Sequence, residues 1–232
     1  MDYTQLTGSS STPGSIARWI NYSQVQGDAP EIVIEAESWI YRRLRHWKML
    51  TPPTAGSLTI GQDYLTNPAD MLEPFLLVTT GQYFQEIVQK PMQEVVANWA
   101  YTGTGNTRVQ QQPLMFAFNQ DQMQFDSPPD QAYIYAFIYY QQPEPLSVSI
   151  TNFLTQTYPR LLRCACMAAA CEFAKDNGQG QYDRTYWDQL AQDEIDKAQA
   201  ESDRARRGTV AGAILIGGGV ASNFPGYVTG YG

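Results

Sequence analysis

Charged residues and histidine are scarce in this sequence of 232 residues. Asp, Glu, Lys and Arg together make up 16% of the chain, whereas they make up about 25% of an ordinary soluble domain. His46 is the single histidine, so an imidazole-activated nucleophile would depend on it alone, and no serine or cysteine in a recognisable nucleophile elbow accompanies it. We therefore interpret His46 as a solvated or hydrogen-bonded side chain and do not expect an enzyme.

Cysteine is also rare, with three residues in the stretch RCACMAAACEFA. An odd number argues against a disulfide framework and fits synthesis in a reducing cytoplasm. A metal site would need a fourth ligand and a CxxC-type spacing, and no histidine is near in the sequence. Because alanines surround Cys164, Cys166 and Cys171, we expect the cysteines to act as small apolar residues that let helices approach closely, with no metal or other cofactor.

The sequence lacks long apolar runs and phosphate-binding glycine motifs. No run reaches the ~18 apolar residues of a membrane-spanning helix, and the start MDYTQLTGSSSTPG has no basic segment followed by an apolar one, as a secretory signal would. The triplet at 217–219 has neither the lysine nor the strand context of a P-loop. We expect a protein without a membrane anchor.

Acidic residues outnumber basic ones by 23 to 15, which gives a net charge of −8 and a pI near 4.6. Duplex DNA is bound chiefly through Lys and Arg side chains that neutralise phosphates, so this balance argues against a general nucleic-acid binder. An acidic wall would repel DNA, which suits a conduit better than a clamp. Gln, Ser, Thr and Tyr replace the missing charges, as expected where partner subunits cover much of the surface.

Apolar residues at intervals of three and four predict an α+β fold that contains a helical bundle. Asp28 and Glu31 have capping-box spacing at the start of the first long helix, and the TPP sequence after Leu50 would stop it. Gly208 is well placed to end the last helix. A short helix is expected over 15–22, and long helices near 28–49, 152–175 and 182–207.

Between the helices, over about 57–141, the apolar period changes to two, which indicates an inserted antiparallel β-region. SLTI, EPFLLVTT and QEIVQK read as short strands, with a helical turn over 92–99. LMFAF, QMQFD and AYIYAFIYY alternate across two tight connections and predict an antiparallel meander. The last of these strands is apolar on both faces, so we expect both to be covered, with the strand central or packed against a neighbour.

The basic stretch RRLRHWK places one arginine on the apolar side of its predicted helix. At about 100° per residue, Arg42, Arg45 and Lys48 fall on the polar face, and Arg43 falls in the apolar arc. A buried arginine needs a carboxylate or carbonyl partner, so we predict that Arg43 is paired within the bundle or across subunits. The other three basic residues suit a solvated or intersubunit face, or contact with passing DNA.

Paired carboxylates leave one enzymatic alternative open. A glycosidase holds two carboxyl groups about 5–9 Å apart, with the acid in an apolar pocket. Glu35 and Glu37, or Glu172 on an otherwise apolar helix, are candidates. The sequence alone does not place them in one cleft.

The segment from Thr209 to Gly232 contains no charged side chain. Its apolar run AGAILI is too short for a membrane anchor, and its apolar content is too high for a disordered linker. We therefore divide the chain into a body, 1–208, with the β-region inserted at about 55–145, and an extended arm, 209–232, that buries apolar side chains against another protein. The arm residues expected to dock are Val210, Ile214, Leu215, Ile216, Val220, Phe224, Tyr227, Val228 and Tyr231.

The order and spacing of four segments resemble the head-to-tail adaptor proteins of tailed bacteriophages, also called connector or head-completion proteins, especially those of short-tailed phages. The segments are EAESWIYRRLR, LTNPADMLE, MQFDSPPDQAYIYAFIYYQQPEPLS and the helix ending in AESDRARRG. Together they cover about Ile16 to Arg207. Two departures are the LTN that precedes Pro68 in place of the usual residues and the C-terminal segment, which does not align.

The resemblance implies a structural virion protein that forms a ring, typically dodecameric, beneath the portal. The arm would dock on the portal, the other end of the ring would receive tail or nozzle proteins, and DNA would pass through the lumen without sequence-specific binding. The protein would be made in the host cytoplasm and located in the head–tail neck of the virion. Two alternatives stay open: a tail-associated cell-wall hydrolase (muramidase), and a tail-tube or gatekeeper protein of different ring symmetry that lacks the arm.

Overall fold

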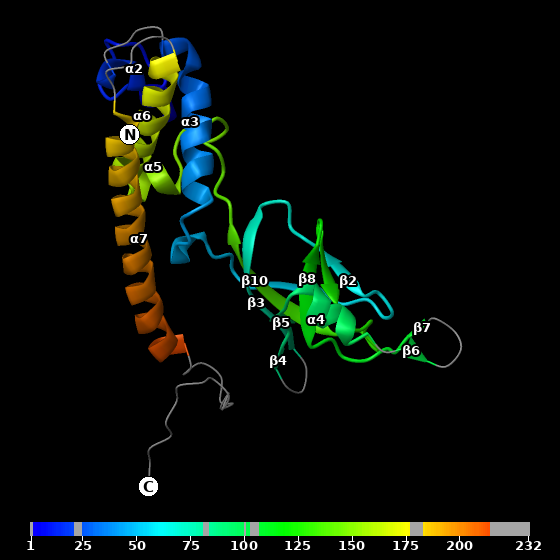
Figure 1. Ribbon diagram of the computed structural model, residues 1–232. Helices are drawn as coiled ribbons and strands as arrows, with labels where there is room; N and C mark the ends of the chain where they lie inside the picture. Colours follow the sequence, from blue (N-terminus) through cyan, green and yellow to red (C-terminus); the bar gives the residue numbers. More distant parts are fainter. Residues whose placement is uncertain are drawn as a thin grey trace.

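Apart from one short helix over 92–97, the helices and the strands occupy different parts of the protein (Figure 1). The computed structural model describes residues 2–20, 25–80, 84–99, 101–102, 107–176 and 183–213. Helices from the two ends of this range form an elongated part, here called the helical unit (2–49 and 146–213), and the strands form the β unit (54–141). The mixed α+β fold expected from the sequence is confirmed.

The helical unit is organised around α6 (Pro159–Asp176), which packs against both α3 (Val25–Tyr41) and α7 (Arg184–Ala213). The middle of α6 reads CACMAAAC, and all eight of these side chains are buried. Small side chains let neighbouring helices approach closely. The shorter helices α1 (Tyr3–Leu6), α2 (Ile16–Trp19) and α5 (Phe153–Thr157) belong to the same unit, and α2 and α5 pack against α6.

The first long helix differs from the prediction at both ends. Its described part begins at Val25, so Asp28 lies inside the helix, and it ends at Tyr41 rather than near Met49. The Arg45 guanidinium donates to the carbonyl of Tyr41 at 2.7 Å, which a continuing helix would use for its own backbone. Leu44 and Met49 are nevertheless buried, which explains why the helical pattern continued past the real end. A 3₁₀ turn, η1 (Trp47–Met49), follows.

The helix predicted over 152–175 is two helices, α5 and α6, with Tyr158 between them. Pro159 has no N–H, and it disfavours helical geometry at the residue before it. The expected start is correct, because Asn152 caps α5 by accepting hydrogen bonds from the backbone N–H groups of Leu154 and Thr155.

The helix predicted to stop at Gly208 continues to Ala213. A glycine inside a helix costs only about 1 kcal/mol relative to alanine, and it ends a helix only where the chain turns into left-handed geometry. The expected boundary between body and arm at 208 is therefore wrong as a helix end, and α7 includes the backbone of Val210.

The described strands form two four-stranded sheets and one two-stranded sheet. The first sheet has the order β1 (Thr54–Ser57), β10 (Ile134–Gln141), β3 (Met71–Thr80) and β4 (Gln85–Glu86). The second has the order β2 (Tyr64–Thr66), β9 (Gln122–Phe125), β8 (Met115–Asn119) and β5 (Val88–Gln89), while β6 (Tyr101–Thr102) pairs with β7 (Thr107–Arg108).

Several strand predictions are confirmed, and one is displaced. EPFLLVTT lies in β3, QEIVQK holds β4 and β5, and the helical turn is α4 (Met92–Ala97). The SLTI strand is wrong beyond its first residue, because β1 ends at Ser57 and the chain turns at Gly61, whose φ is +75°. A positive φ of this kind suits glycine.

The predicted three-stranded meander is wrong in its third member. β8 and β9 form the expected antiparallel pair, but β10 joins the other sheet. The connection SPPD is not a tight turn, because Ser127, Pro128 and Pro129 are buried. The carbonyls of Pro128 and Pro129 accept hydrogen bonds from the N–H groups of Gln111 and Gly61 at 2.9 Å each, so the segment crosses from one sheet to the other.

The central position expected for β10 is confirmed, since β1 and β3 pair with its two edges. Phe137 and Tyr139 project into a core shared by the two larger sheets, together with Leu77 of β3 and Phe116 of β8. The other face is less covered than expected, because Ile134 is 58% exposed. The β unit therefore has its own apolar core and presents part of one sheet face.

The close packing of α6 can be tested by overfilling it. Ala170 is fully buried in the core of the helical unit, so Ala170→Leu should lower the free energy of unfolding by about 1–3 kcal/mol through displaced neighbours. Ala200→Leu on the exposed side of α7 is the matched control and should change it by less than about 0.5 kcal/mol. Chemical denaturation measures both, and equal effects would contradict close packing at α6.

Candidate assembly surfaces

The predicted arm is only partly within the described residues. Val210 lies in the backbone of α7, and the other eight arm residues, from Ile214 to Tyr231, lie outside the part of the chain that the structure describes. The arm therefore stays a prediction, and the part of it that follows the described helix is 214–232. In Figure 1, the C-terminal end of α7 lies away from α2 and the N-terminal helices.

Polar contacts join the helical unit to the β unit near the end of α3. Arg45 pairs with Glu73 of β3, with 2.7 Å between Nε and Oε2. Arg206 of α7 donates to the hydroxyl of Tyr140 in β10 at 2.9 Å. Because α7 contacts both η1 and β10, this helix fixes the direction in which the chain leaves the body.

Arg43 is exposed, so its predicted burial within the chain is wrong. The helix has ended at Tyr41, and Arg43 therefore does not lie on the apolar arc of α3. Its guanidinium lies 4.2 Å from the centre of the Trp39 ring and donates to the Trp39 carbonyl at 3.3 Å. A carbonyl partner is thus present, and contact across subunits stays a prediction. Arg45, expected on the polar face, is half-buried against Glu73.

His46 is fully buried at the same junction and is hydrogen-bonded, which confirms one of the two expected environments. Its Nδ1 accepts from the backbone N–H of Lys48 at 3.3 Å. The Tyr158 hydroxyl donates to Glu201 at 2.8 Å and lies 3.0 Å from His46 Nε2. The tyrosine proton is already used, so Nε2 carries the imidazole proton and donates it to the tyrosine oxygen. This pattern requires the neutral ring.

Burial lowers the pKa of His46 from its ordinary value of 6.5. Glu201 acts in the opposite direction, whereas Lys48 and Arg206 lower the pKa further. A protonated Nδ1 would also face the Lys48 N–H donor without an acceptor. The side chain therefore links η1, Tyr158 and α7 most tightly when it is uncharged.

Glu37 is the one candidate carboxylate that is buried. It accepts hydrogen bonds from the Asn152 side-chain amide at 2.6 Å and from the backbone N–H of Leu146 at 3.1 Å. Burial raises its pKa, and these hydrogen bonds lower it in part. These contacts tie α3 to the segment that enters α5, which is a structural role.

Glu35 and Glu37 do not point into one cleft. Glu35 is exposed and lies two positions from Glu37 on α3, which places the two side chains on opposite faces of the helix. Glu172 on α6 forms an ion pair with Arg184. The pair of Glu35 and Glu37 therefore lacks the geometry that a muramidase requires.

The three cysteines are buried and free, as the packing interpretation predicts. Burial raises the pKa of Cys171 to about 11 and also raises that of Cys166, so both thiols are protonated at neutral pH. Within the described ranges, no cluster of three or more His, Cys, Asp or Glu side chains could hold a metal ion. None of the helices described there is long and apolar enough to span a membrane.

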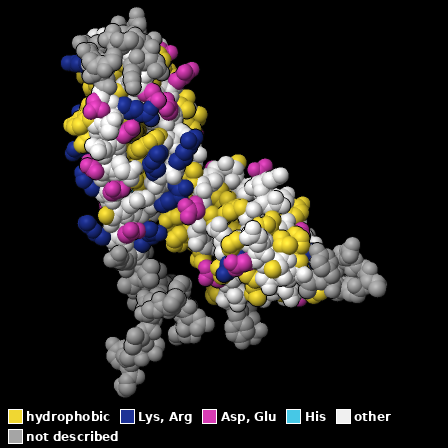
Figure 2. Space-filling model, viewed as in Figure 1, with side chains coloured by type: hydrophobic (Ala, Val, Ile, Leu, Met, Phe, Trp, Pro, Cys, Tyr) yellow, Lys and Arg dark blue, Asp and Glu magenta, His cyan; other side chains and the backbone are white. Residues whose placement is uncertain are grey.

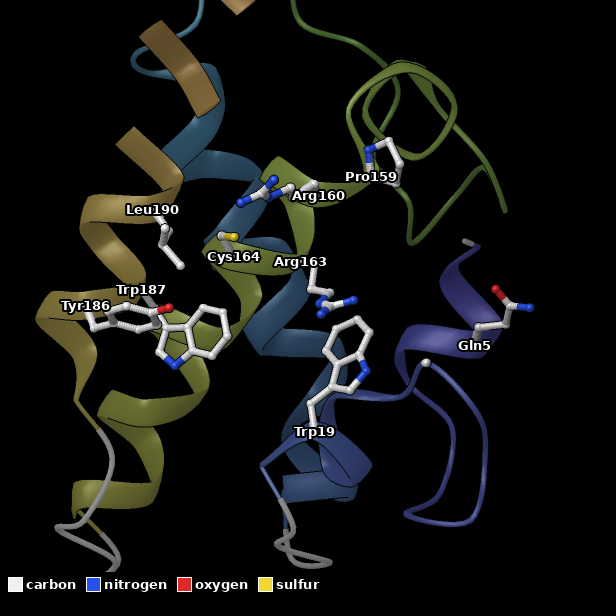
Figure 3. A pocket seen from close by; sticks show the side chains of 10 residues that line it. Gln5, Trp19, Pro159, Arg160, Arg163, Cys164, Tyr186, Trp187 and Leu190 are labelled. Atoms are coloured by element: carbon white, nitrogen blue, oxygen red, sulfur yellow. The ribbon is translucent and has the colours of Figure 1, made fainter. Parts of the chain in front are cut away.

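A groove of about 800 Å³ lies on the face of α6 that points away from α3 (Figure 3). Trp19 of α2 forms one wall, and Tyr186, Trp187 and Leu190 of α7 form the other. Arg160 and Arg163 of α6 line it between the walls. The Arg163 guanidinium lies 5.0 Å from the Trp19 ring centre, and Arg160 is 3.6 Å from Glu194. The groove is aromatic and carries positive charge.

Exposed apolar side chains gather on the β unit. Figure 2 shows patches of hydrophobic side chains among uncharged ones on the visible face of this unit, whereas most visible Lys and Arg side chains lie on the helical unit. Clustered exposed apolar residues are typical of surfaces that bind other proteins. The larger ones are Ile60, Tyr64, Phe75, Phe84, Val88, Val96, Leu114, Phe118 and Ile134.

A family model described as SU10 adaptor protein matches residues 6–213, which run from the buried Leu6 of α1 to the end of α7. No curated protein matches the chain.

The buried histidine predicts how stability depends on pH. Because the pKa of His46 is lower in the folded chain than in the unfolded chain, the unfolded state takes up a proton first as the pH falls. The contribution of His46 should be constant above about pH 6.5 and should destabilise the fold progressively below it. His46→Gln should lose this dependence, whereas any contribution of Glu37 is common to both proteins. NMR titration of the single imidazole measures its pKa directly, and a value at or above 6.5 would contradict the assignment.

Proposed function

The chain belongs to the SU10 adaptor protein family and is a structural adaptor of a bacteriophage virion; we propose that it forms a ring beneath the portal and joins the portal to the tail. The ring, dodecameric by resemblance to head-to-tail adaptors, would leave a channel through which DNA passes. Tail or nozzle proteins would bind its other end. In a closed ring, each subunit presents the same set of surfaces to its neighbours, to the portal and to the tail.

The observation that carries this proposal is the division of the chain at the end of α7. The family match ends at residue 213, and the 19 residues beyond it include eight of the nine apolar arm residues and no charged side chain. Burial of such side chains contributes about 1.5–3 kcal/mol each, which outweighs the ordering entropy of a docked segment only when a partner covers them. The arm is therefore proposed to be 214–232 and to dock on the portal.

The charge distribution supports a conduit for DNA. Residues 54–141 contain eight acidic and two basic side chains, so this range carries a net charge of −6 out of −8. DNA phosphates are repelled by such a unit, and translocating DNA would not adhere to it. We place sequence-specific DNA contacts nowhere on the chain, and we assign no catalytic step.

Removing the arm tests the portal contact. A chain that ends at Ala213 keeps all of α7, so it should unfold at the same temperature as the full chain and yet fail to co-sediment with portal-bearing heads. In the full-length chain, Ile214→Ser, Leu215→Ser and Ile216→Ser together should weaken attachment, because they remove apolar area that docking would bury. The control Ser222→Ala with Asn223→Ala should attach normally. Undiminished attachment of the truncated chain would refute the role of the arm.

A further inference from the structure

Two surfaces of the helical unit have opposite charge and are built on different helices. The first is the groove lined by Trp19, Tyr186, Trp187, Leu190, Arg160 and Arg163. The second, here called the α3 ridge, consists of Glu31, Ile34 and Glu35. In Figure 3, which looks into the groove, α3 lies behind α6. The groove lies over α6 and α7, and the ridge lies on α3.

The α3 ridge is exposed and acidic. Glu31 and Glu35 are exposed, and Ile34 between them is 49% exposed. These residues lie opposite the buried face of α3, which includes Ile32, Val33 and Ala36. The helix has four acidic side chains and no basic one over Val25–Tyr41, so nothing on α3 itself neutralises the ridge.

The groove complements the ridge in both chemistry and shape. It is concave, its walls are aromatic and aliphatic, and its two arginines stand on consecutive turns of α6. Glu31 and Glu35 likewise stand one turn apart on α3. Arg160 pairs with the carboxylate of Glu194 at 3.6 Å, and 68% of its side chain is exposed. An exposed aliphatic residue flanked by carboxylates is the kind of surface that such a groove accepts.

We propose that the α3 ridge of one copy docks in the groove of the next copy, and that this contact is the lateral interface of the ring. The proposal rests on the proposed ring function. A symmetric pair would bring arginines against arginines or glutamates against glutamates, and both arrangements are repulsive. A head-to-tail contact brings opposite charges together, and repetition of one heterologous contact generates a ring when the rotation closes.

Charge reversal tests the contact. Arg160→Glu with Arg163→Glu, or Glu31→Arg with Glu35→Arg, should each abolish assembly into oligomers, because every interface would then hold like charges. The chain with all four changes restores opposite charges at every interface and should assemble with itself but not with the wild-type chain. Native mass spectrometry, alone and on portal-bearing heads, gives the oligomeric state, and thermal unfolding verifies the fold of each variant. Normal assembly of either double variant, or no recovery in the fourfold variant, overturns the proposal.

Cysteine cross-linking gives an independent measurement. On portal-bearing heads, Ile34→Cys with Tyr186→Cys should yield covalent multimers under mild oxidation, whereas the control Ile60→Cys with Tyr186→Cys should not; the native cysteines are buried. A cross-link that Tyr186→Cys forms with Ser222→Cys but not with Ile34→Cys would identify the C-terminal segment as the groove's occupant and overturn the proposal. If the Ile34→Cys, Tyr186→Cys chain forms oligomers on portal-bearing heads without a disulfide between the two introduced thiols, this interface is overturned but the adaptor function stays intact. If no oligomer formed under any condition, both this interface and the proposed ring would be refuted.

Discussion

The close packing of α6 between its neighbours is the interaction on which the rest of the helical unit depends. Cys164, Cys166 and Cys171, with the alanines around them, leave α6 narrow enough for α3 and α7 to pack against it. A helix surrounded by larger side chains would push these neighbours outward. The separation between the groove and the α3 ridge, and the path of α7 toward its C-terminal end, are both consequences of this packing.

Polar groups then hold the units in position at the junction. His46, Tyr158 and Glu201 form a continuous hydrogen-bonded chain from η1 to α7, and Arg206 extends the contact from α7 to Tyr140 of β10. Glu37 connects α3 to the N-terminal cap of α5 in the same manner. His46, Glu37 and Asn152 are buried, and buried polar groups are costly when unpaired, so these contacts favour one arrangement of the helices over others.

The sequence predicted the elements that are governed by local periodicity and missed those governed by competing contacts. The helices, the hairpin of β8 and β9, and the central position of β10 follow from apolar spacing. The end of α3 does not, because Arg45 takes the Tyr41 carbonyl through a contact that no periodic pattern contains. The burial of Ser127, Pro128 and Pro129 was also not predicted, because prolines in a sequence usually indicate an exposed turn. The exposed position of Arg43 was not predicted either, because it depends on where α3 ends. The groove was not foreseen because Trp19 and Trp187 are far apart in the sequence and meet only across α6.

The overall charge and the proposed contacts act at different ranges. Each copy carries a net charge of −8, most of it in the β unit, so copies repel one another while they are free in solution. The attraction between the α3 ridge and the groove is short-ranged, because salt screens exposed charges beyond about 8 Å. Contact therefore requires that copies first be brought together by something else. Docking of uncharged arms on a common portal would do this without adding to the repulsion, and it would raise the effective concentration of neighbouring ridges and grooves. On this argument, assembly is favoured on the portal rather than before it, and the absence of charge from the C-terminal segment is as necessary to that order as its apolar side chains.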